Sequence, residues 1–334
     1  LSSIDRDNRD SDTDARYLIA AGDVSWILSP RVAFFFKYRH RDRDIDNPST
    51  VTIRDLSDPT NLTQYEVDPS ISAVTDRVTG TFRFKPFRSL TLRAEYSFHE
   101  IRREDAEAWE LPDSTQTNTA SLSADIRVKR SLKINAKYIH KERNDPAYNI
   151  DPDHSDEGKV SLTWLPVSRI SMLLSYRLAA EERSDLHFIT PTFFLNDTAP
   201  DERTVRRDTF LGSSTFLLLN NLSCTASYSY MHSKVKQDIG YFLLDFNLGV
   251  PVVTDQEVPY KDTVNFYSLT FNYTPADRID LSAGINHTES KATFHPSSPG
   301  LLQPESIASF SKLETKETAA LLSGKYEFKN GVGF

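Results

Sequence analysis

Basic side chains recur at alternate positions along several short stretches of the chain. Lys37 and Arg39 lie two residues apart in FKYRH, and Lys133 and Lys137 lie four apart in LKINAKY. Even spacings place side chains on one face of a β-strand, and a wall of cations attracts anions or an acidic protein surface through its summed field. The cations that we assign to such a wall, lining a lumen and contacting a partner or an anion, are Lys37, Arg39, Arg77, Arg83, Arg93, Arg127, Lys133, Lys137 and Arg177.

The same face also carries acidic residues, which leaves a second interpretation open. Three further cations and six carboxylates fall on it by the same alternation: Lys85, Lys129, Lys325, Asp23, Glu95, Asp125, Asp208, Asp280 and Glu327. The face is basic although the chain has a net charge of -8, so the loops must carry the negative excess. The alternative is that these charges only pair across strands and keep the wall hydrated.

The elements that position these cations are amphipathic strands. In LTLRAEYSF, Leu90 to Phe98, every second residue is apolar and the others are polar. The alternation has period two, which predicts a strand and not a helix. The pattern recurs with a tyrosine on the apolar face at the same offset in VAFFFKY, LKINAKY, ISMLLSYRL and LSCTASY. The aromatic residues that we expect to form a lipid-facing belt are Trp26, Tyr38, Tyr96, Tyr138, Trp164, Tyr176, Tyr228 and Tyr273.

Short and long links alternate along the chain. Within hairpins the links are short turn sequences such as KPFRS, KRS, LPVSR, NN and TPADR, rich in turn-forming Pro, Asn, Asp and Ser. Between hairpins they are long and hydrophilic, at roughly 41–76, 101–117, 142–158, 181–208, 234–264 and 290–317. We therefore expect an up-and-down antiparallel sheet of about thirteen strands.

The apolar faces could meet a protein core or lipid. A soluble β-sandwich or an extracellular repeat array would need those faces to meet one another. Here they share one composition and carry an aromatic residue near the end, as membrane-interface girdles do. We expect a transmembrane β-barrel of the bacterial outer membrane, multi-pass, with short periplasmic turns and long extracellular loops.

Residues 1–334 are expected to form a single transmembrane β-barrel domain, or part of one. The chain opens on LSSIDRDNRDSDTD, which resembles the inside of a protein. The first strand, about Tyr17 to Leu28, runs inward to the turn at Ser29-Pro30-Arg31, so at least one strand is expected before residue 1. Tyr326 and Phe328 with KNGVGF either close the barrel or form another periplasmic turn; we favour the turn, and with it a larger barrel.

Several function classes find no support in the sequence. The single cysteine, Cys224, excludes an internal disulfide, a four-cysteine zinc site and a C-x-x-C-H haem attachment motif. The negative net charge argues against nucleic acid as a partner. There is no Gly-x-Ser-x-Gly or HExxH motif, and the Asp-rich tracts do not fit an EF-hand. We expect no enzymatic activity, no catalytic residue, no metal site and no cofactor held by this chain.

Two outgoing strands and the loops after them resemble a known family. KYRHRDRDIDNPST at 37–50 and KYIHKERNDPAYN at 137–149 share Lys-Tyr-x-His-(Arg/Lys)-(Asp/Glu)-Arg-(Asp/Asn), followed by Pro. They look like the MtrB/PioB family of outer-membrane porin partners of multihaem c-type cytochromes. Family members are larger barrels than the strands counted here.

The resemblance implies a barrel that encases periplasmic and outer-surface multihaem cytochromes and aligns them for electron transfer across the outer membrane. Haem c would be carried by those partners, and lipid would surround the barrel. The alternatives are a diffusion porin or anion-preferring channel, and a surface adhesion or assembly barrel. For the last, the apolar segments DLHFITPTFFL and GYFLLDFNLGVPVV would form a docking surface.

Overall fold

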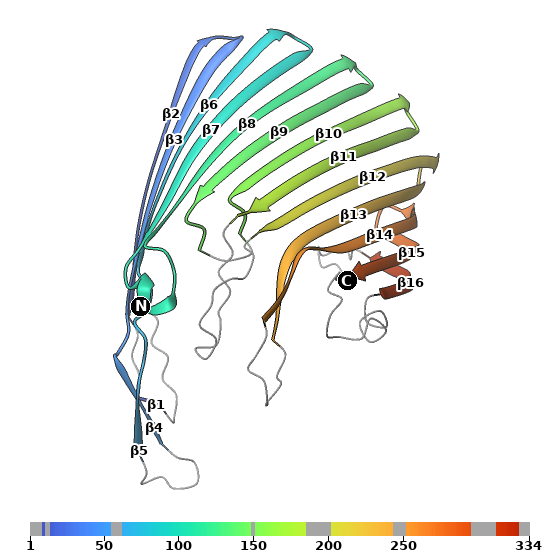
Figure 1. Ribbon diagram of the computed structural model, residues 1–334. Coiled ribbons are helices and arrows are strands. Elements are labelled where there is room, and N and C mark those ends of the chain that lie inside the picture. The colour runs from blue at the N-terminus through green and yellow to red at the C-terminus, as the bar shows by residue number, and fades with distance from the viewer. Residues whose placement is uncertain are drawn as a thin grey trace. The chain divides into compact units, whose positions relative to one another are not determined.

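The computed structural model describes residues 9–10, 14–54, 62–147, 151–184, 202–242, 252–294 and 312–326. Most of them lie in antiparallel strands that follow one another in chain order (Figure 1). One sheet has thirteen strands in the order β16-β15-β14-β13-β12-β11-β10-β9-β8-β7-β6-β3-β2. The predicted all-β, up-and-down fold class and the strand number are therefore confirmed.

The thirteen strands are longer than a bilayer crossing requires. They range from 13 to 25 residues, whereas about 9–11 tilted residues cross a bilayer, so each strand extends beyond the lipid. The strands are β2 (Asp14–Ser29), β3 (Val32–Asp46), β6 (Ala73–Phe87), β7 (Leu90–Arg103), β8 (Ser114–Lys129), β9 (Leu132–Asn144), β10 (His154–Val167), β11 (Ile170–Arg183), β12 (Arg203–Leu219), β13 (Leu222–Phe242), β14 (Val252–Ala276), β15 (Ile279–Phe294) and β16 (Lys312–Tyr326).

The short turns lie where the turn residues predict them. Between β2 and β3 the Ser29 hydroxyl oxygen accepts hydrogen bonds from the backbone N–H groups of Arg31 and Val32, both at 3.2 Å. This is the local side-chain-to-backbone bonding that favours serine in turns. Two-residue turns also join β12 to β13 and β14 to β15.

The long links contain more structure than the sequence predicts. Within the first of them, β4 (Thr50–Arg54) and β5 (Leu62–Glu66) pair, and β1 (Arg9–Asp10) adds a third strand to this small sheet. The link predicted at 234–264 is wrong over much of its length, because β13 continues to Phe242 and β14 begins at Val252. On the face that carries Tyr228, Lys234 and Lys236 replace the apolar side chains, and backbone pairing continues where the apolar alternation has ended. A 3₁₀ helix, η1 (Ala106–Trp109), lies between β7 and β8.

Backbone contacts divide the chain into two compact units. Unit 1 comprises Leu1–Lys85, Arg93–Ser121 and His140–His154, and unit 2 comprises Pro86–Leu92, Leu122–Ile139 and Ser155–Phe334. Unit 1 holds β2 and β3 whole and β6 as far as Lys85, and unit 2 holds β11 to β16 whole and β10 from Ser155. The single barrel domain predicted for residues 1–334 stays a prediction.

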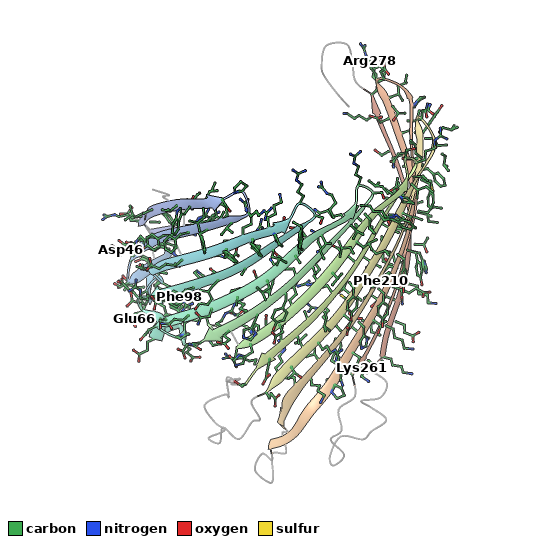
Figure 2. All side chains as sticks on the ribbon, turned by 90° about the horizontal axis from the view of Figure 1, so that it is seen from above. Asp46, Glu66, Phe98, Phe210, Lys261 and Arg278 are labelled. Atoms are coloured by element: carbon green, nitrogen blue, oxygen red, sulfur yellow. The ribbon has the colours of Figure 1, made fainter. Side chains whose placement is uncertain are left out.

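The described residues bury very little apolar surface. Side chains project from both faces of the strands (Figure 2). The buried apolar residues are Ala33, Ala106, Ala179, Val205 and Ala292, whereas many large ones are exposed, among them Trp26 at 62% and Leu122 at 61%. A soluble sheet would bury such side chains against a second layer. Apolar side chains that point outward along alternating strands are the arrangement of a membrane barrel.

Candidate anion-binding groove and the two aromatic girdles

In unit 1, three strands bring five of the predicted wall cations together. β3 pairs with β6 so that Lys37 lies opposite Thr79, Arg39 opposite Arg77, and Phe35 opposite Thr81. Directly opposite residues of an antiparallel pair share a face, so the odd-numbered residues of both strands lie on one side. β7 is the next strand of the sheet and adds Arg93 and Glu95.

These side chains line a groove of about 440 Å³. Its lining residues are Phe35, Lys37, Arg39, Arg77, Thr79, Thr81, Arg83, Arg93 and Glu95. Five are cationic and one is a carboxylate, so the groove is strongly basic. Its volume is in the range of small-molecule sites.

The single carboxylate does not neutralise the groove. Glu95 accepts a hydrogen bond from the Thr81 hydroxyl at 3.1 Å. The Arg77 Nε donates to the Ser97 hydroxyl at 3.2 Å, and the Arg83 guanidinium lies over the Phe35 ring, 5.4 Å from its centroid. Within the described part of the chain, Lys37, Arg39 and Arg93 form no ion pair with a carboxylate.

Two like charges face each other across this groove. Arg39 and Arg77 are directly opposite in the β3–β6 register, an arrangement that destabilises a sheet unless an anion is present. Local violations of folding rules concentrate at functional sites. The arrangement can bind a carboxylate, a phosphate or an acidic protein surface by charge-assisted hydrogen bonds.

The other four predicted wall cations lie in unit 2. Arg177 donates to Glu157 at 2.8 Å, and Lys133 lies 3.9 Å from Asp125. Arg127 and Lys137 are exposed. Two of the four are therefore locally compensated, as the alternative interpretation of paired wall charges predicts for them.

One acidic residue was assigned to the wrong face. Asp208 lies opposite His232 and accepts a hydrogen bond from the Tyr176 hydroxyl at 2.6 Å, so it lies on the tyrosine face. The β11–β12 register agrees, because Asp208 lies opposite Leu178, two residues from the Tyr176–Phe210 pair.

The eight residues of the predicted belt lie in two groups. Trp26, Trp164 and Tyr273 lie near the short turns: Trp26 pairs with Phe34 and Tyr273 with Leu222. The five others, which we call the girdle tyrosines, lie seven residues into the strand that follows a turn: Tyr38, Tyr96, Tyr138, Tyr176 and Tyr228. Outer-membrane barrels carry aromatic girdles at both interfaces. All eight are exposed except Tyr228, which is half-buried.

A hydrogen bond that the sequence analysis missed recurs at every girdle tyrosine. Each hydroxyl donates to an Asp or Asn on the next strand of the thirteen-stranded sheet, and the five acceptors are Asp76, Asn118, Asp156, Asp208 and Asn265. The strand registers at Tyr38, Tyr176 and Tyr228 explain this bond. In each, the acceptor lies two residues N-terminal to the residue that pairs with the tyrosine, and so on the same face. The recurrence of Asp or Asn on the apolar side of each ingoing strand was the available signal.

Asp76 gathers the largest of these clusters. It accepts from Tyr38 and contacts the His40 Nδ1 and the Arg102 guanidinium, each at 2.8 Å. Among the described residues, no group of three or more His, Cys, Asp or Glu side chains could hold a metal ion. The apolar segments DLHFITPTFFL and GYFLLDFNLGVPVV lie mostly outside the described residues, as does Phe328.

No protein-family model matches this chain, and no curated protein matches it. Within the described residues, no helix is long and apolar enough to cross a membrane. Solved structures do resemble it. The RagAB peptide importer in its closed-closed state shares 9% identity over 90% of this chain and 39% of its own, with a TM-score of 0.53.

Two other similar structures are more distant. The FrpB iron transporter of Neisseria meningitidis shares 12% identity over 96% of this chain and 57% of its own, with a TM-score of 0.44. The outer membrane channel DcaP of Acinetobacter baumannii shares 10% identity over 98% of this chain and 100% of its own, with a TM-score of 0.40. The chain spans 39% and 57% of the first two matched structures. The thirteen-stranded sheet and its likeness to RagAB give this chain the fold of a bacterial outer-membrane β-barrel, located in that membrane.

Proposed function

We propose that the chain forms part of an outer-membrane β-barrel that encases and aligns multihaem c-type cytochromes for electron transfer across the membrane. The observation that carries the proposal is the basic groove of β3, β6 and β7, with five cations and one carboxylate. Haem propionates and acidic side chains on a cytochrome surface are the anions that such a groove would contact. The likeness of the outgoing strands to the MtrB/PioB family supports the choice of partner.

This division of labour assigns no redox group to the chain itself. Its one cysteine, Cys224, lies in LSCTASY without a C-x-x-C-H motif, so haem c would be attached to the partners. The barrel residues would hold the guest in register and shield it from lipid. The groove cations would fix the orientation of the guest by charge complementarity.

A second candidate function rests on the same groove. An open lumen with a basic constriction is an anion-preferring channel, because a ring or patch of one charge sign selects ions of the other sign. The two functions differ in whether a protein occupies the lumen.

The decisive experiment is a visible absorption spectrum of the full-length barrel, purified from its native membrane in mild detergent. A strong Soret band that corresponds to several haems per barrel and resists salt washing supports the sheath. The variant Lys37→Gln/Arg39→Gln/Arg93→Gln should then release haem at lower salt than the parent. Lys133→Gln, which removes a cation already paired with Asp125, is the matched control and should behave like the parent. A colourless, pure barrel that conducts ions in a planar bilayer contradicts the sheath and supports the channel.

A further inference from the structure

A row of three cations crosses β12, β13 and β14 in unit 2. Arg206 lies directly opposite Lys234, and Lys234 lies directly opposite Lys261. The three therefore share one face of the sheet. Like charges placed directly opposite one another destabilise a sheet, so this row needs a compensating anion.

The row lies on the face of the girdle tyrosines. Lys234 and Tyr228 are six residues apart in β13, and Lys261 and Tyr267 are six apart in β14, so each pair points to the same side. The Tyr228 and Tyr267 rings contact each other across the two strands, tilted by 35° with 5.2 Å between their centroids. The cations thus face the lipid and not the lumen.

Successive rows on this face change from apolar to cationic. Along β13 and β14, starting near the short turns that follow β12 and β14, Cys224 pairs with Phe271, then Ala226 with Leu269, then Tyr228 with Tyr267. The row of Phe210, Tyr230 and Asn265 follows, then Asp208, His232 and Thr263, and then the cations. This is the order of hydrocarbon, interface and headgroup region that a strand meets as it leaves a bilayer.

The distance matches the headgroup layer. The cations lie four residues farther along the strands than the Phe210–Tyr230 pair. At about 3.3 Å per residue and a tilt of about 40°, the cations lie roughly 10 Å beyond those aromatic rings along the membrane normal. In Figure 2, Lys261 of β14 lies toward the side of the sheet away from Arg278, which lies in the short turn after β14. Short turns face the periplasm in outer-membrane barrels, so the cations lie at the outer leaflet.

The protein supplies little compensation for this charge. Arg206 is 67% exposed and lies 3.6 Å from Asp208, whose carboxylate also accepts the Tyr176 hydroxyl. Lys234 and Lys261 form no ion pair within the described residues. The neighbouring strand pair β15–β16 differs: there Lys291 pairs with Glu314 at 3.1 Å and Lys316 with Glu289 at 3.3 Å.

We propose that Arg206, Lys234 and Lys261 form a binding site for the phosphate groups of an outer-leaflet glycolipid, the phosphorylated headgroup of lipopolysaccharide. Each cation donates charge-assisted hydrogen bonds to phosphate oxygens, while the aromatic rows below contact the sugar and the start of the acyl chains. The site depends on the barrel fold and not on whether the lumen holds a cytochrome.

The test is binding of purified lipopolysaccharide to the full-length barrel in detergent, compared with the same glycolipid after enzymatic removal of its phosphates. At about 1 kcal/mol per basic residue near an anionic surface, each cation replaced should weaken binding about fivefold, and Arg206→Gln/Lys234→Gln/Lys261→Gln roughly 100-fold. Dephosphorylated glycolipid should bind parent and variant equally weakly. Lys291→Gln is the matched control, and Lys234→Arg/Lys261→Arg should retain binding.

Three results would overturn the proposal. One is a triple variant that is folded, as judged by heat-modifiable migration on gels, and binds lipopolysaccharide as tightly as the parent does. Another is equal binding of dephosphorylated and native glycolipid. The third is displacement of the glycolipid by inorganic phosphate at millimolar concentration, which would assign the site to the free ion.

Discussion

The groove of β3, β6 and β7 predicts an anion preference that two charge reversals would abolish. Its five cations and one carboxylate give a formal charge of +4. Arg39 and Arg77 lie opposite each other within it. Replacing both with glutamate changes the charge by -4, so the groove becomes formally neutral without loss of its polar lining.

The size of the effect follows from Coulomb's law and screening. A univalent anion about 8 Å from a unit charge in water gains about 0.5 kcal/mol, so four charges give about 2 kcal/mol. Debye lengths of about 30 Å at 0.01 M salt, 8 Å at 0.15 M and 3 Å at 1 M reduce this to roughly 1.5, 0.7 and 0.1 kcal/mol. The double variant should therefore lose roughly tenfold in anion preference at 0.01 M and threefold at 0.15 M, with no measurable loss at 1 M.

The assay is the reversal potential of the full-length barrel, freed of any guest, in a planar bilayer under a potassium chloride gradient. Arg31→Glu/Arg88→Glu is the control, because it makes the same charge change at two exposed turn residues outside the groove lining. An equal shift in both variants, or a shift in Arg39→Glu/Arg77→Glu that persists at 1 M salt, would refute an electrostatic role for the groove.

Three further predictions concern stability, each measured by denaturant unfolding of the barrel in micelles. Tyr96→Phe removes the hydrogen bond to Asn118 and should lower the free energy of unfolding by about 1 kcal/mol. Tyr273→Phe is the control, because the Tyr273 hydroxyl has no hydrogen-bond partner among the described residues. Equal losses of stability in the two variants would count against a contribution from the Tyr96–Asn118 bond. Arg177→Gln and Glu157→Gln should show a coupling of about 0.5–1 kcal/mol in a double-mutant cycle for their 2.8 Å ion pair, and additive effects would show that the pair contributes nothing. Gly284→Ala should lower the stability of the barrel, because the new Cβ would lie 3.1 Å from the Thr270 hydroxyl oxygen and 3.2 Å from the Leu269 carbonyl oxygen. Gly80→Ala, which places its Cβ in open space, should raise the stability by up to about 1 kcal/mol. A barrel that is stabilised by Gly284→Ala and destabilised by Gly80→Ala would contradict the packing argument.

The alternation of side chains made the fold predictable. In LTLRAEYSF and its relatives the period of two identifies strands, and the short Pro-, Asn- and Ser-containing links identify turns. These are local signals, and the thirteen strands follow from them. The outer parts of β13 and β14 were missed because Lys234 and Lys236 stand on the face that carries apolar side chains nearer the turn, so the apolar pattern that identifies the strand ends before the backbone pairing does.

The sequence predicted which cations lie on the inner face of the strands, but not which of them lie next to one another. Parity placed Lys37, Arg39 and Arg77 on one face, but only the β3–β6 register shows that Arg39 and Arg77 meet. Register depends on pairing between segments far apart in the chain, with the β4–β5 hairpin inserted between them. The irregularity in the β12–β13 register between Leu217 and Leu219 is likewise invisible to a period-two pattern.

The scarcity of buried apolar side chains makes lipid a structural component of this protein. Of the five apolar residues that are buried among those described, four are alanines, so water alone offers the chain almost no hydrophobic free energy for folding. Side chains such as Leu122 and Leu322, 61% and 87% exposed, leave water only when lipid acyl chains surround them. Folding and membrane insertion must therefore be one event, and the thickness and composition of the bilayer should tune stability as core mutations do in a soluble domain.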